Sequence, residues 1–421
     1  MKLMVIGGGG REHAIIKKLK ENPAVEKIYC LPGNGGIAAD AVCVPEIGAK
    51  DIPAQVEFAK AHRIDYAVVA PDDPLALGAV DALTEAGIPC FGPDKKAAVI
   101  EASKAFSKDL MKKYGIPTAK CEIFTEMEKA LAYLDTQSAP IVVKADGLAL
   151  GKGVVVAATI DEAKQAVIEM MQGGKFGRSG ARVLIEECMV GREVTVLCFC
   201  DGKTIVPMKA SQDHKRVFDG DKGPNTGGMG AFAPSPLYTR HIAERTEREI
   251  LLPTLRAMNA EGFTFKGVLY VGLMLTKDGP KVVEYNARFG DPETQVVLPL
   301  LDSDLFAIMR AVREQRLAEM DIRWKDGAAA CVVLASGGYP GKYEGGKPIS
   351  GLEEAEAMGA TVYHAGTKRT DAGYVTAGGR VLGVTALGDT LADAIHKAYA
   401  AAEQIHFDGA HMRRDIGKLD M

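Results

Sequence analysis

The sequence predicts an α/β protein of several domains, and three observations support this prediction. The chain has 421 residues, whereas one hydrophobic core usually stops growing at about 250 residues. It is 47% hydrophobic and 25% charged, which is typical of folded globular proteins. Short apolar runs alternate with helix-like stretches along its N-terminal part. Such alternation indicates a parallel sheet covered by helices.

The N-terminal part combines candidate strands with loops suited to a ligand. Ligands of a parallel sheet bind where the strands end at their carboxyl side. The loops at these ends are rich in glycine, proline and aspartate, so this edge of the sheet is a candidate ligand surface. The strands are residues 3–6, 27–31, 66–70 and 89–91, and the loops are residues 7–10, 32–36 and 71–74.

The middle of the chain begins with a helix at residues 103–114, which Gly115-Ile116-Pro117 brings to an end. A second unit starts near Cys121. Further on, Asp-Gly pairs at 201–202 and 278–279 indicate antiparallel hairpins. The predicted strands of this part are residues 141–144, 154–157, 183–187, 193–200, 267–275 and 281–285, with a helix at 161–171.

Two features distinguish the rest of the chain. Residues 213–236 are rich in glycine and proline and are predicted to form a long loop, and loops of that length are usually functional or disordered. After residue 326 the pattern changes to a small α/β unit. Its strands are predicted at residues 328–334 and 380–386, and its helix at residues 391–405 has one apolar face.

Composition excludes several classes of partner. Lys and Arg number 51 against 55 for Asp and Glu, so no overall positive field would gather a nucleic-acid backbone. No apolar run approaches the roughly 20 residues that span a bilayer, and glycines follow the N-terminal apolar run too soon for a signal peptide. The eight cysteines form no Cys-x-x-Cys pair, which indicates buried thiols in a reducing compartment. We expect a cytoplasmic protein that binds neither nucleic acid nor membrane.

The four glycines at residues 7–10 follow a predicted strand. Backbone amides in such a turn can approach a phosphate. The nicotinamide-cofactor pattern G-x-G-x-x-G is not met, because its third glycine falls on Glu12 or His13 and no acidic residue follows the next strand to hold a ribose. A phosphate loop of another kind is the favoured interpretation, and a tight turn without a ligand is the alternative.

Residues 146–153 form a second glycine-rich turn. They depart from the P-loop pattern, because three residues separate the two glycines and Gly153, rather than Ser or Thr, follows Lys152. An amide-rich turn with Lys152, preceded by Lys144 at the end of a strand, is still suited to a polyphosphate. The alternative is a surface hairpin with two solvated lysines.

Glu284 and Asn286 lie two residues apart on a predicted strand, so their side chains share one face. A carboxylate beside an amide oxygen suits Mg²⁺, which takes water and phosphate oxygens as its remaining ligands. Arg288 follows and can grip a carboxylate or a phosphate. The alternative is an edge strand whose polar face meets water.

A charged cluster, residues 213–216, precedes the glycine-rich residues 227–230 within the predicted loop. Cations beside a flexible backbone could bind an anionic substrate, whereas the plainer interpretation is a solvated charge run. His214 need not be catalytic, because a histidine in such a cluster can simply add charge or a hydrogen bond.

Taken in order, these segments resemble the ATP-grasp ligases, and specifically the phosphoribosylamine-glycine ligase family, over the whole chain. The residues at 286–293 are the most specific. The resemblance rests on residues 7–13, 32–36, 143–153, 186–187, 213–215, 227–231 and 286–293.

The resemblance implies an N-terminal parallel-sheet domain, a two-part ATP-grasp core and a small C-terminal α/β domain. The expected boundaries are 1–101 for the N-terminal substrate-binding domain, 102–122 for a connector, 123–190 and 191–326 for the small and central ATP-grasp subdomains, and 327–421 for the C-terminal domain.

The resemblance also implies a nucleotide held between the two subdomains, with a divalent cation, Mg²⁺ or Mn²⁺, on Glu284 and Asn286. Many ATP-grasp enzymes supply a further acidic metal ligand from the preceding strand, but residues 270–274 contain none. The ATP contacts implied are Lys104 and Lys144 at the phosphates, Gly151, Lys152 and Gly153 closing over them, Glu186, Glu187 and Met189 at the adenine, and Glu193 at the ribose.

The implied reaction joins glycine to phosphoribosylamine. The glycine carboxylate attacks the γ-phosphate of ATP, and the amine then displaces phosphate from the glycyl phosphate. Arg288 and Asp213 are the catalytic residues implied. The substrate contacts implied are Gly9, Gly10, Gly33, Asn34, Gly35, Asp213, Lys215, Arg288 and Gly290.

The sequence is also compatible with other functions. The first alternative is an ATP-grasp carboxylase of the biotin or aminoimidazole ribonucleotide type. A non-catalytic nucleotide-binding protein and a nicotinamide oxidoreductase are further alternatives. In each ligase interpretation the partners are small molecules, and the chain is expected to be a monomer or a weak homo-oligomer.

Overall fold

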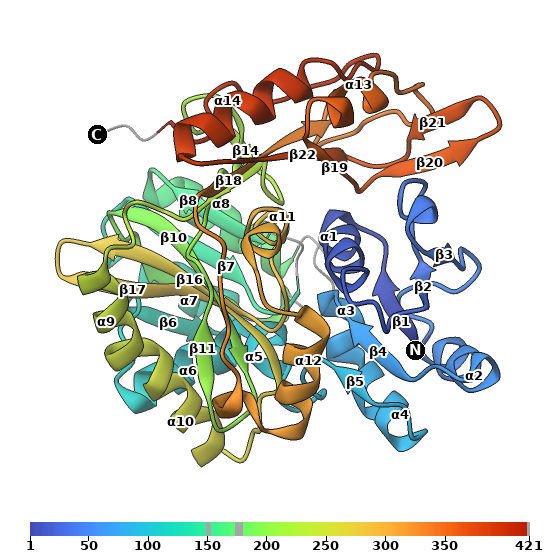
Figure 1. Ribbon diagram of the computed structural model, residues 1–421. Coiled ribbons are helices and arrows are strands. Elements are labelled where there is room, and N and C mark those ends of the chain that lie inside the picture. The colour runs from blue at the N-terminus through green and yellow to red at the C-terminus, as the bar shows by residue number, and fades with distance from the viewer. Residues whose placement is uncertain (149–152, 173–179, 419–421) are drawn as a thin grey trace.

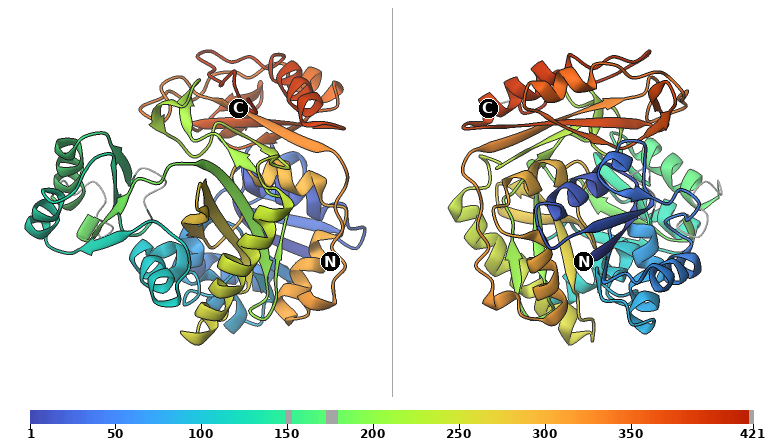
Figure 2. Two further views of the ribbon diagram at one scale, coloured as in Figure 1. Left: turned by 90° about the vertical axis from the view of Figure 1, so that its left-hand side faces the viewer. Right: turned by 45° about the vertical axis from the view of Figure 1, so that its right-hand side comes forward.

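The computed structural model describes residues 1–148, 153–172 and 180–418. Figure 1 shows the N-terminal region beside the central part of the chain, with the C-terminal region lying across both. A four-stranded lobe that begins near residue 121 projects from the rest, as the left view of Figure 2 makes clear. The predicted α/β architecture is confirmed.

The N-terminal region is a five-stranded parallel sheet in the order β3-β2-β1-β4-β5. The four predicted strands are confirmed, and only the short edge strand β3 was not predicted. The strands are β1 Lys2–Gly7, β2 Lys27–Pro32, β3 Val42–Cys43, β4 Tyr66–Val69 and β5 Cys90–Phe91, and the helices are α1 Gly10–Leu19, α2 Ile52–His62, α3 Asp72–Leu77, α4 Ala79–Glu85 and α5 Val99–Ala102, with a 3-10 turn η1 at Ile37–Ala39.

The connecting helix α6, Lys104–Tyr114, begins and ends at the signals predicted for it. The Ser103 hydroxyl accepts a hydrogen bond from the Phe106 amide at 3.1 Å, and Gly115 ends the helix with a φ of 66°. A positive φ of this kind favours glycine, which has no Cβ to clash. The helix therefore places Lys104 in its first turn.

The projecting lobe is a four-stranded antiparallel sheet in the order β6-β9-β7-β8. The apolar face of α8, with Ala163, Val167 and Met170, packs into its core. The predicted strands and helix of the lobe are confirmed. Its elements are β6 Cys121–Phe124, α7 Met127–Leu134, β7 Ile141–Ala145, β8 Val154–Ala157, α8 Ile160–Met171 and β9 Val183–Glu187.

The central sheet has the order β11-β10-β16-β17 and is antiparallel. The turn at Asp278 joins β16 to β17 as predicted, whereas the turn at Asp201 leads into the short strand β11. The elements are β10 Arg192–Cys200, β11 Ile205–Pro207, α9 Arg240–Thr246, η3 Glu247–Leu251, α10 Leu252–Ala260, β16 Gly267–Thr276, β17 Gly279–Asn286, α11 Thr294–Val297, η4 Leu298–Leu300, α12 Leu305–Glu314 and η5 Leu317–Glu319.

The prediction that residues 213–236 form a loop is wrong. The segment contains a hairpin and strand β15, and β15 pairs antiparallel with β18 from far along the chain. Strands this short, rich in glycine, carry no alternating pattern in the sequence, and their partner is not local. The strands are β12 Gln212–Asp213, β13 Arg216–Phe218, β14 Lys222–Asn225 and β15 Gly230–Ala233.

The C-terminal sheet therefore has the order β12-β15-β18-β22-β19, with two of its strands supplied from the middle of the chain. Its predicted strands and helix are confirmed. The remaining elements are β18 Ala328–Ala335, α13 Leu352–Ala357, β19 Thr361–His364, β20 Thr367–Thr370, β21 Gly373–Thr376, β22 Arg380–Gly388 and α14 Leu391–Ala402.

The regions share packing as well as strands. One cluster of buried apolar side chains contains Met4 and Leu83 of the N-terminal region together with Val194 and Leu255 of the central region. Such a continuous core holds the two regions in a fixed relation. No helix in the described ranges is long and apolar enough to cross a membrane.

Candidate active site

A cavity of about 560 Å³ lies where the regions meet. It is bordered by α6, by strands of the projecting lobe and the central sheet, and by loops of the N- and C-terminal regions. Most of the predicted nucleotide and metal residues line it. They are Lys104, Lys144, Gly153, Glu186, Glu187, Met189, Glu193, Asp213, Lys215, Glu284, Asn286 and Arg288.

Other predicted residues are placed differently. Gly151 and Lys152 lie outside the described residues. Gly9, Gly10, Gly33, Asn34, Gly35 and Gly290 are not among the cavity's lining residues.

Asn34 instead ties the N-terminal region to the C-terminal one. Its Nδ2 donates to the Gly8 carbonyl at 2.9 Å and to the His364 carbonyl at 2.8 Å. The Gly35 amide donates to the Thr367 carbonyl at 2.9 Å. These glycine-rich turns are thus engaged with protein, and their predicted role toward the substrate stays a prediction.

Glu284 and Asn286 lie on β17 opposite Gly272 and Tyr270 of β16. A Cβ at Gly272 would lie 3.4 Å from Glu284 Cγ, so the glycine leaves room over this carboxylate. Burial opposes ionisation of Glu284, but the lysines and the arginine around it outweigh burial and lower its pKa. The chemistry is that of an anionic oxygen beside an amide oxygen, which suits a hard cation.

Lys104 connects α6 to the start of the second glycine-rich turn. Its Nζ donates to the Gly147 carbonyl at 2.6 Å. Asp146 accepts from the Ala105 amide at 3.1 Å and forms an ion pair with Arg182. Burial lowers the pKa of Lys104, which means that a nearby anion would stabilise its charged form. This corner is suited to a phosphate.

The cavity also contains a buried ion-pair cluster of Glu186, Lys144 and Lys108. Glu186 Oε2 lies 2.9 Å from Lys144 Nζ and 3.3 Å from Lys108 Nζ. Lys108 was not predicted, although it lies one helical turn after Lys104 and so faces the same way. The apolar side chains that line the cavity include Met111, Val142, Val154, Val156, Met189 and Met274.

Carboxylates crowd the cavity around Asp213. Burial and the neighbouring Glu293, Glu193 and Glu284 raise the pKa of Asp213 to about 7, although Lys215 acts in the other direction. Lys215 Nζ donates to Glu193 Oε2 at 2.6 Å. A carboxyl whose pKa lies near neutrality can accept and release a proton at physiological pH.

Arg288 is held by residues that were not predicted. Its Nη2 lies 3.1 Å from Glu101 Oε1, and Glu101 Oε2 accepts from the Ala287 amide at 2.7 Å. The guanidinium lies 5.8 Å from the centre of the Tyr270 ring. Its Nε is buried and has no hydrogen-bond partner within the described ranges. The arginine is thus held in a fixed orientation at the cavity.

Three regions meet at Asp291, which follows Arg288 in the predicted motif. The Arg11 amide donates to Asp291 Oδ2 at 3.2 Å. Arg380 Nη1 donates to the carbonyls of Asp291 and Gly227 at 2.8 and 2.9 Å. Arg11 and Arg380 were missed because they are far from Asp291 in the sequence and no local pattern pairs them.

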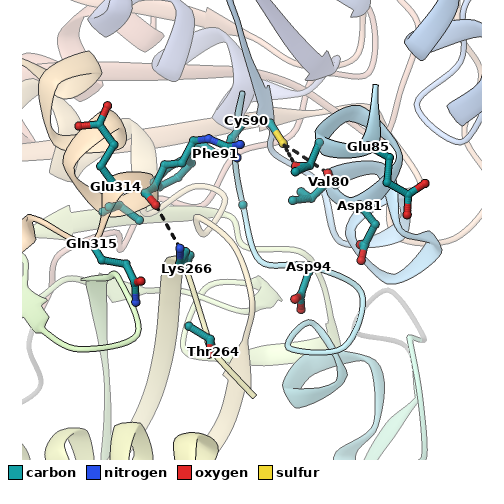
Figure 3. A pocket seen from close by; sticks show the side chains of 14 residues that line it. Val80, Asp81, Glu85, Cys90, Phe91, Asp94, Thr264, Lys266, Glu314 and Gln315 are labelled. Carbon is teal, nitrogen blue, oxygen red and sulfur yellow. Dashed lines mark hydrogen bonds between the residues drawn. The ribbon is translucent and has the colours of Figure 1, made fainter. Parts of the chain in front are cut away.

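A second cavity, of about 700 Å³, lies between α4 and β5 on one side and the ends of β16 and α12 on the other. None of the predicted site residues lines it. Lys266 Nζ donates to the Arg313 carbonyl at 3.1 Å, and a dashed line at Lys266 marks this hydrogen bond in Figure 3. Asp94 accepts from the Ala97 amide at 2.7 Å.

The parallel N-terminal sheet, the projecting lobe over a central antiparallel sheet and the charged cavity between them define an ATP-grasp protein. Models of the three domains of one family match the chain: phosphoribosylglycinamide synthetase N domain at residues 1–101, ATP-grasp (A) domain at 102–294 and C domain at 329–419. The chain belongs to the phosphoribosylglycinamide synthetase family, and the resemblance seen in the sequence is confirmed.

Named relatives and solved structures agree with this family. The chain is 50% identical to the phosphoribosylamine-glycine ligases of Vibrio cholerae serotype O1 and of Escherichia coli K12, and in both cases the match covers 99% of this chain and 98% of the relative. The crystal structure of phosphoribosylamine-glycine ligase from Thermotoga maritima is 34% identical with a TM-score of 0.84, and it covers 99% of this chain and 100% of that one.

More distant structures share the fold alone. The biotin carboxylase domain of Hydrogenobacter thermophilus 2-oxoglutarate carboxylase has a TM-score of 0.74 at 16% identity, covering 98% of this chain and 91% of that chain. Similarity at this level identifies an architecture and not a substrate.

Proposed function

We propose that the chain catalyses the ATP-dependent ligation of glycine to 5-phosphoribosylamine, which gives glycinamide ribonucleotide, ADP and phosphate in de novo purine biosynthesis. Full-length relatives at 50% identity carry this activity in their names. The observation that carries the proposal is that Lys104 of α6 lines one cavity together with Glu284 and Arg288, which come from a distant segment of the chain.

The cavity's polarity orients the nucleotide. The purine lies between the apolar side chains near Glu186 and Met189, and the phosphates extend toward Lys104 and Lys144. Both lysines are held in place by protein contacts, because Lys104 donates a hydrogen bond to the Gly147 carbonyl and Lys144 forms an ion pair with Glu186. Fixed cations of this kind stabilise charge on a transferring phosphoryl group without reorganising.

Glu284 and Asn286 are the residues that would hold Mg²⁺ or Mn²⁺. An ionised carboxylate beside an amide oxygen fits such a cation. The described part of the chain has no group of three or more His, Cys, Asp or Glu placed to hold a metal, so phosphate oxygens and water would supply the remaining ligands. When bound there, the cation offsets negative charge on the nucleotide phosphates.

Arg288 holds the glycine carboxylate in line with the γ-phosphate. The carboxylate oxygen attacks phosphorus, the bond to ADP breaks, and glycyl phosphate forms. Glu101 and the Tyr270 ring fix the arginine on two sides, while its unpaired Nε faces no protein acceptor in the described residues. Positioning of this kind is the main contribution a protein makes to phosphoryl transfer.

Asp213 completes the second step. The amine of phosphoribosylamine attacks the carbonyl carbon of glycyl phosphate, phosphate leaves, and the new amide nitrogen loses a proton. A carboxylate with a pKa of about 7 accepts that proton near neutral pH. Gly9 and Gly10, next to Arg11 at the rim of the cavity, stay the predicted contacts to the sugar phosphate.

A coupled assay of ADP release tests the proposal, with phosphoribosylamine generated in situ. ADP release is expected to need both glycine and the amine and to ignore bicarbonate. Release that depends on bicarbonate and not on glycine would indicate the carboxylase alternative. Nucleotide binding without turnover in the complete mixture would indicate a non-catalytic protein.

A further inference from the structure

Arg380, the first residue of β22, extends from the C-terminal region to two loops of the cavity wall. Its Nη1 donates to the carbonyls of Gly227 and Gly228 on one loop, at 2.9 and 3.3 Å. The same nitrogen donates to the Asp291 carbonyl on the other loop at 2.8 Å and lies 3.5 Å from Asp291 Oδ1. One guanidinium therefore joins two loops that are distant in the sequence.

The two glycines are suited to this close approach. A Cβ at Gly227 would lie 2.8 Å from Arg380 Cζ, and a Cβ at Gly228 would lie 2.5 Å from Pro292 Cδ. Gly228 also has a φ of 120°. Glycine is the residue that permits such contacts and such a φ. Arg380 and Pro292 therefore hold this loop from two sides.

Thr226 connects the same loop to Lys215. Its Oγ1 accepts from the Gly228 amide at 2.9 Å and donates to the Lys215 carbonyl at 2.8 Å. The Thr226 amide donates to that carbonyl as well, at 2.7 Å. Thr226, Lys215 and Asp213 all line the cavity. A shift of the glycine pair would therefore displace Lys215 and, through it, the neighbouring Asp213.

The other loop connects Arg380 to the N-terminal region. Asp291 accepts from the Arg11 amide through Oδ2 at 3.2 Å and from Gln295 Nε2 through Oδ1 at 2.7 Å. Burial opposes ionisation of Asp291, but Arg380 and Arg11 outweigh burial and lower its pKa. Arg380 thus helps to keep a charged carboxylate at the start of α1, where Arg11 lies beside the cavity.

We propose that Arg380 is a positioning residue of the ligation, which sets Lys215 and Arg11 in place by holding the two loops together. This inference rests on the proposed function, in which Asp213 accepts a proton in the second step. Arg380 acts through backbone carbonyls and the Asp291 carboxylate, and no contact with the reacting atoms is assigned to it. The C-terminal region is then a part of the active site and not only a cover over it.

Arg380→Met keeps most of the side-chain length and removes every donor. It should lower kcat at saturating substrates by about 100-fold, the loss that a displacement of about 1 Å causes, and leave the KM for ATP unchanged. Arg380→Lys should restore a part of kcat, because an ammonium keeps the charge but not the planar fork. A raised KM for the amine with kcat unchanged would overturn the proposal, since it would assign Arg380 to the substrate itself.

Thr226 offers a matched pair of variants for the same connection. Thr226→Val has the same shape without the hydroxyl, and it should lower kcat by about 10-fold, the scale of one buried hydrogen bond. Thr226→Ser keeps the hydroxyl and should retain most of kcat. Equal kcat values for the two variants would overturn the proposal. If Arg380→Met does not fold, this pair decides the question.

Hydrogen exchange measured by mass spectrometry tests the role of Arg380 without turnover. Arg380→Met should speed exchange of the amides in residues 213–216 and 225–231 by about 10-fold, in line with one lost contact to a charged group. Exchange in β1 should stay unchanged. Faster exchange throughout the chain would show that Arg380 supports overall stability, and unchanged exchange in both segments would show that it does not hold the loops. Either result would overturn the proposal.

Arg414→Met is the matched control, because Arg414 is an exposed arginine of the same region whose side chain pairs with Glu403. It should leave kcat and the exchange of both segments unchanged. If the ligase assay fails but Arg380→Met still speeds exchange only in these two segments, the role of Arg380 in holding the loops stands and the proposed reaction does not. Ligase activity together with unchanged exchange would have the opposite meaning.

Discussion

The two cavities differ in what their polar groups do rather than in how large they are. The cavity between α4 and α12 is the larger, at about 700 Å³ against 560 Å³. Around it, Asp81 and Asp94 accept hydrogen bonds from backbone amides and Lys266 donates to a backbone carbonyl. The smaller cavity instead brings together charges that the fold does not fully pair.

This difference identifies the smaller cavity as the site, because its incompletely paired groups lower the stability of the ligand-free protein. Asp213 has a raised pKa among other carboxylates, and buried atoms of Glu186 and Arg288 have no partner within the described ranges. Arrangements of this kind lower the stability of the protein without its ligand. They cluster at functional sites, where contacts with the bound ligand offset the lost stability. In the larger cavity burial also lowers the pKa of Lys266, but no lining residue among those described has a buried side-chain nitrogen or oxygen without a hydrogen-bond partner.

The strongest contrast between the cavities is expected from Glu284→Ala. Removing this carboxylate takes away a cation ligand, so kcat/KM should fall by about 1,000-fold or more, comparable to the loss of a main electrostatic contact. Activity titrated with Mg²⁺ should show a weaker apparent metal affinity while the melting temperature stays close to that of the unaltered chain. Lys281→Ala on the same strand is the control, and an unchanged Mg²⁺ dependence for Glu284→Ala would refute the assignment.

Arg288→Lys comes next, because it keeps the charge and loses the planar fork that matches a carboxylate. We expect the KM for glycine to rise by about 100-fold, in line with one lost bidentate contact to a charged group, while the KM for ATP changes little. Steady-state kinetics with each substrate varied in turn measures both. An equal rise in the two KM values would assign Arg288 to the nucleotide instead.

The dependence of kcat on pH tests the role of Asp213 in the smaller cavity. The deprotonated carboxylate is the active form, so kcat should rise as pH increases through about 7 and level off above it. Asp213→Asn should lower kcat by about 100-fold, the scale of general-base catalysis, and should remove the rise. A variant that keeps the same pH dependence would show that another group titrates.

The smallest effect is expected in the larger cavity. Lys266→Met removes the hydrogen bond to the Arg313 carbonyl, which should cost about 1 kcal/mol of unfolding free energy and leave kcat/KM within about 2-fold, because none of the predicted site residues lines this cavity. Urea denaturation and the ADP assay measure the two quantities. A loss of activity comparable to that of Arg288→Lys would show that the larger cavity also contributes to activity, and it would contradict the distinction drawn between the two cavities.

Much of this fold follows from local sequence pattern. Strands such as β1 and β17 have clear apolar alternation or continuous apolar runs, and the spacing of Glu284 and Asn286 already places them on one face. The same reasoning could have found Lys108 from its position four residues after Lys104. These features depend on neighbours within a few residues.

What could not be predicted depends on distant partners. Asp291 meets Arg11 across 280 residues and Arg380 across 89, and Glu101 reaches the Ala287 amide across 186. Strand β15 was missed for the same reason, since its partner β18 lies in a different part of the chain. No single sequence pattern records such pairings.

Strand β15 also determines how the chain can be divided. Because β12 and β15 lie in the C-terminal sheet, a fragment ending at residue 326 would expose the edge along which β15 pairs with β18, together with the fully buried Phe232. Unpaired edges of this kind associate with one another. Fragments 1–326 and 327–421 should therefore be poorly soluble apart and should copurify when produced together, because the five-stranded sheet would then form between two polypeptides. Recovery of a soluble 1–326 fragment alone would contradict this expectation.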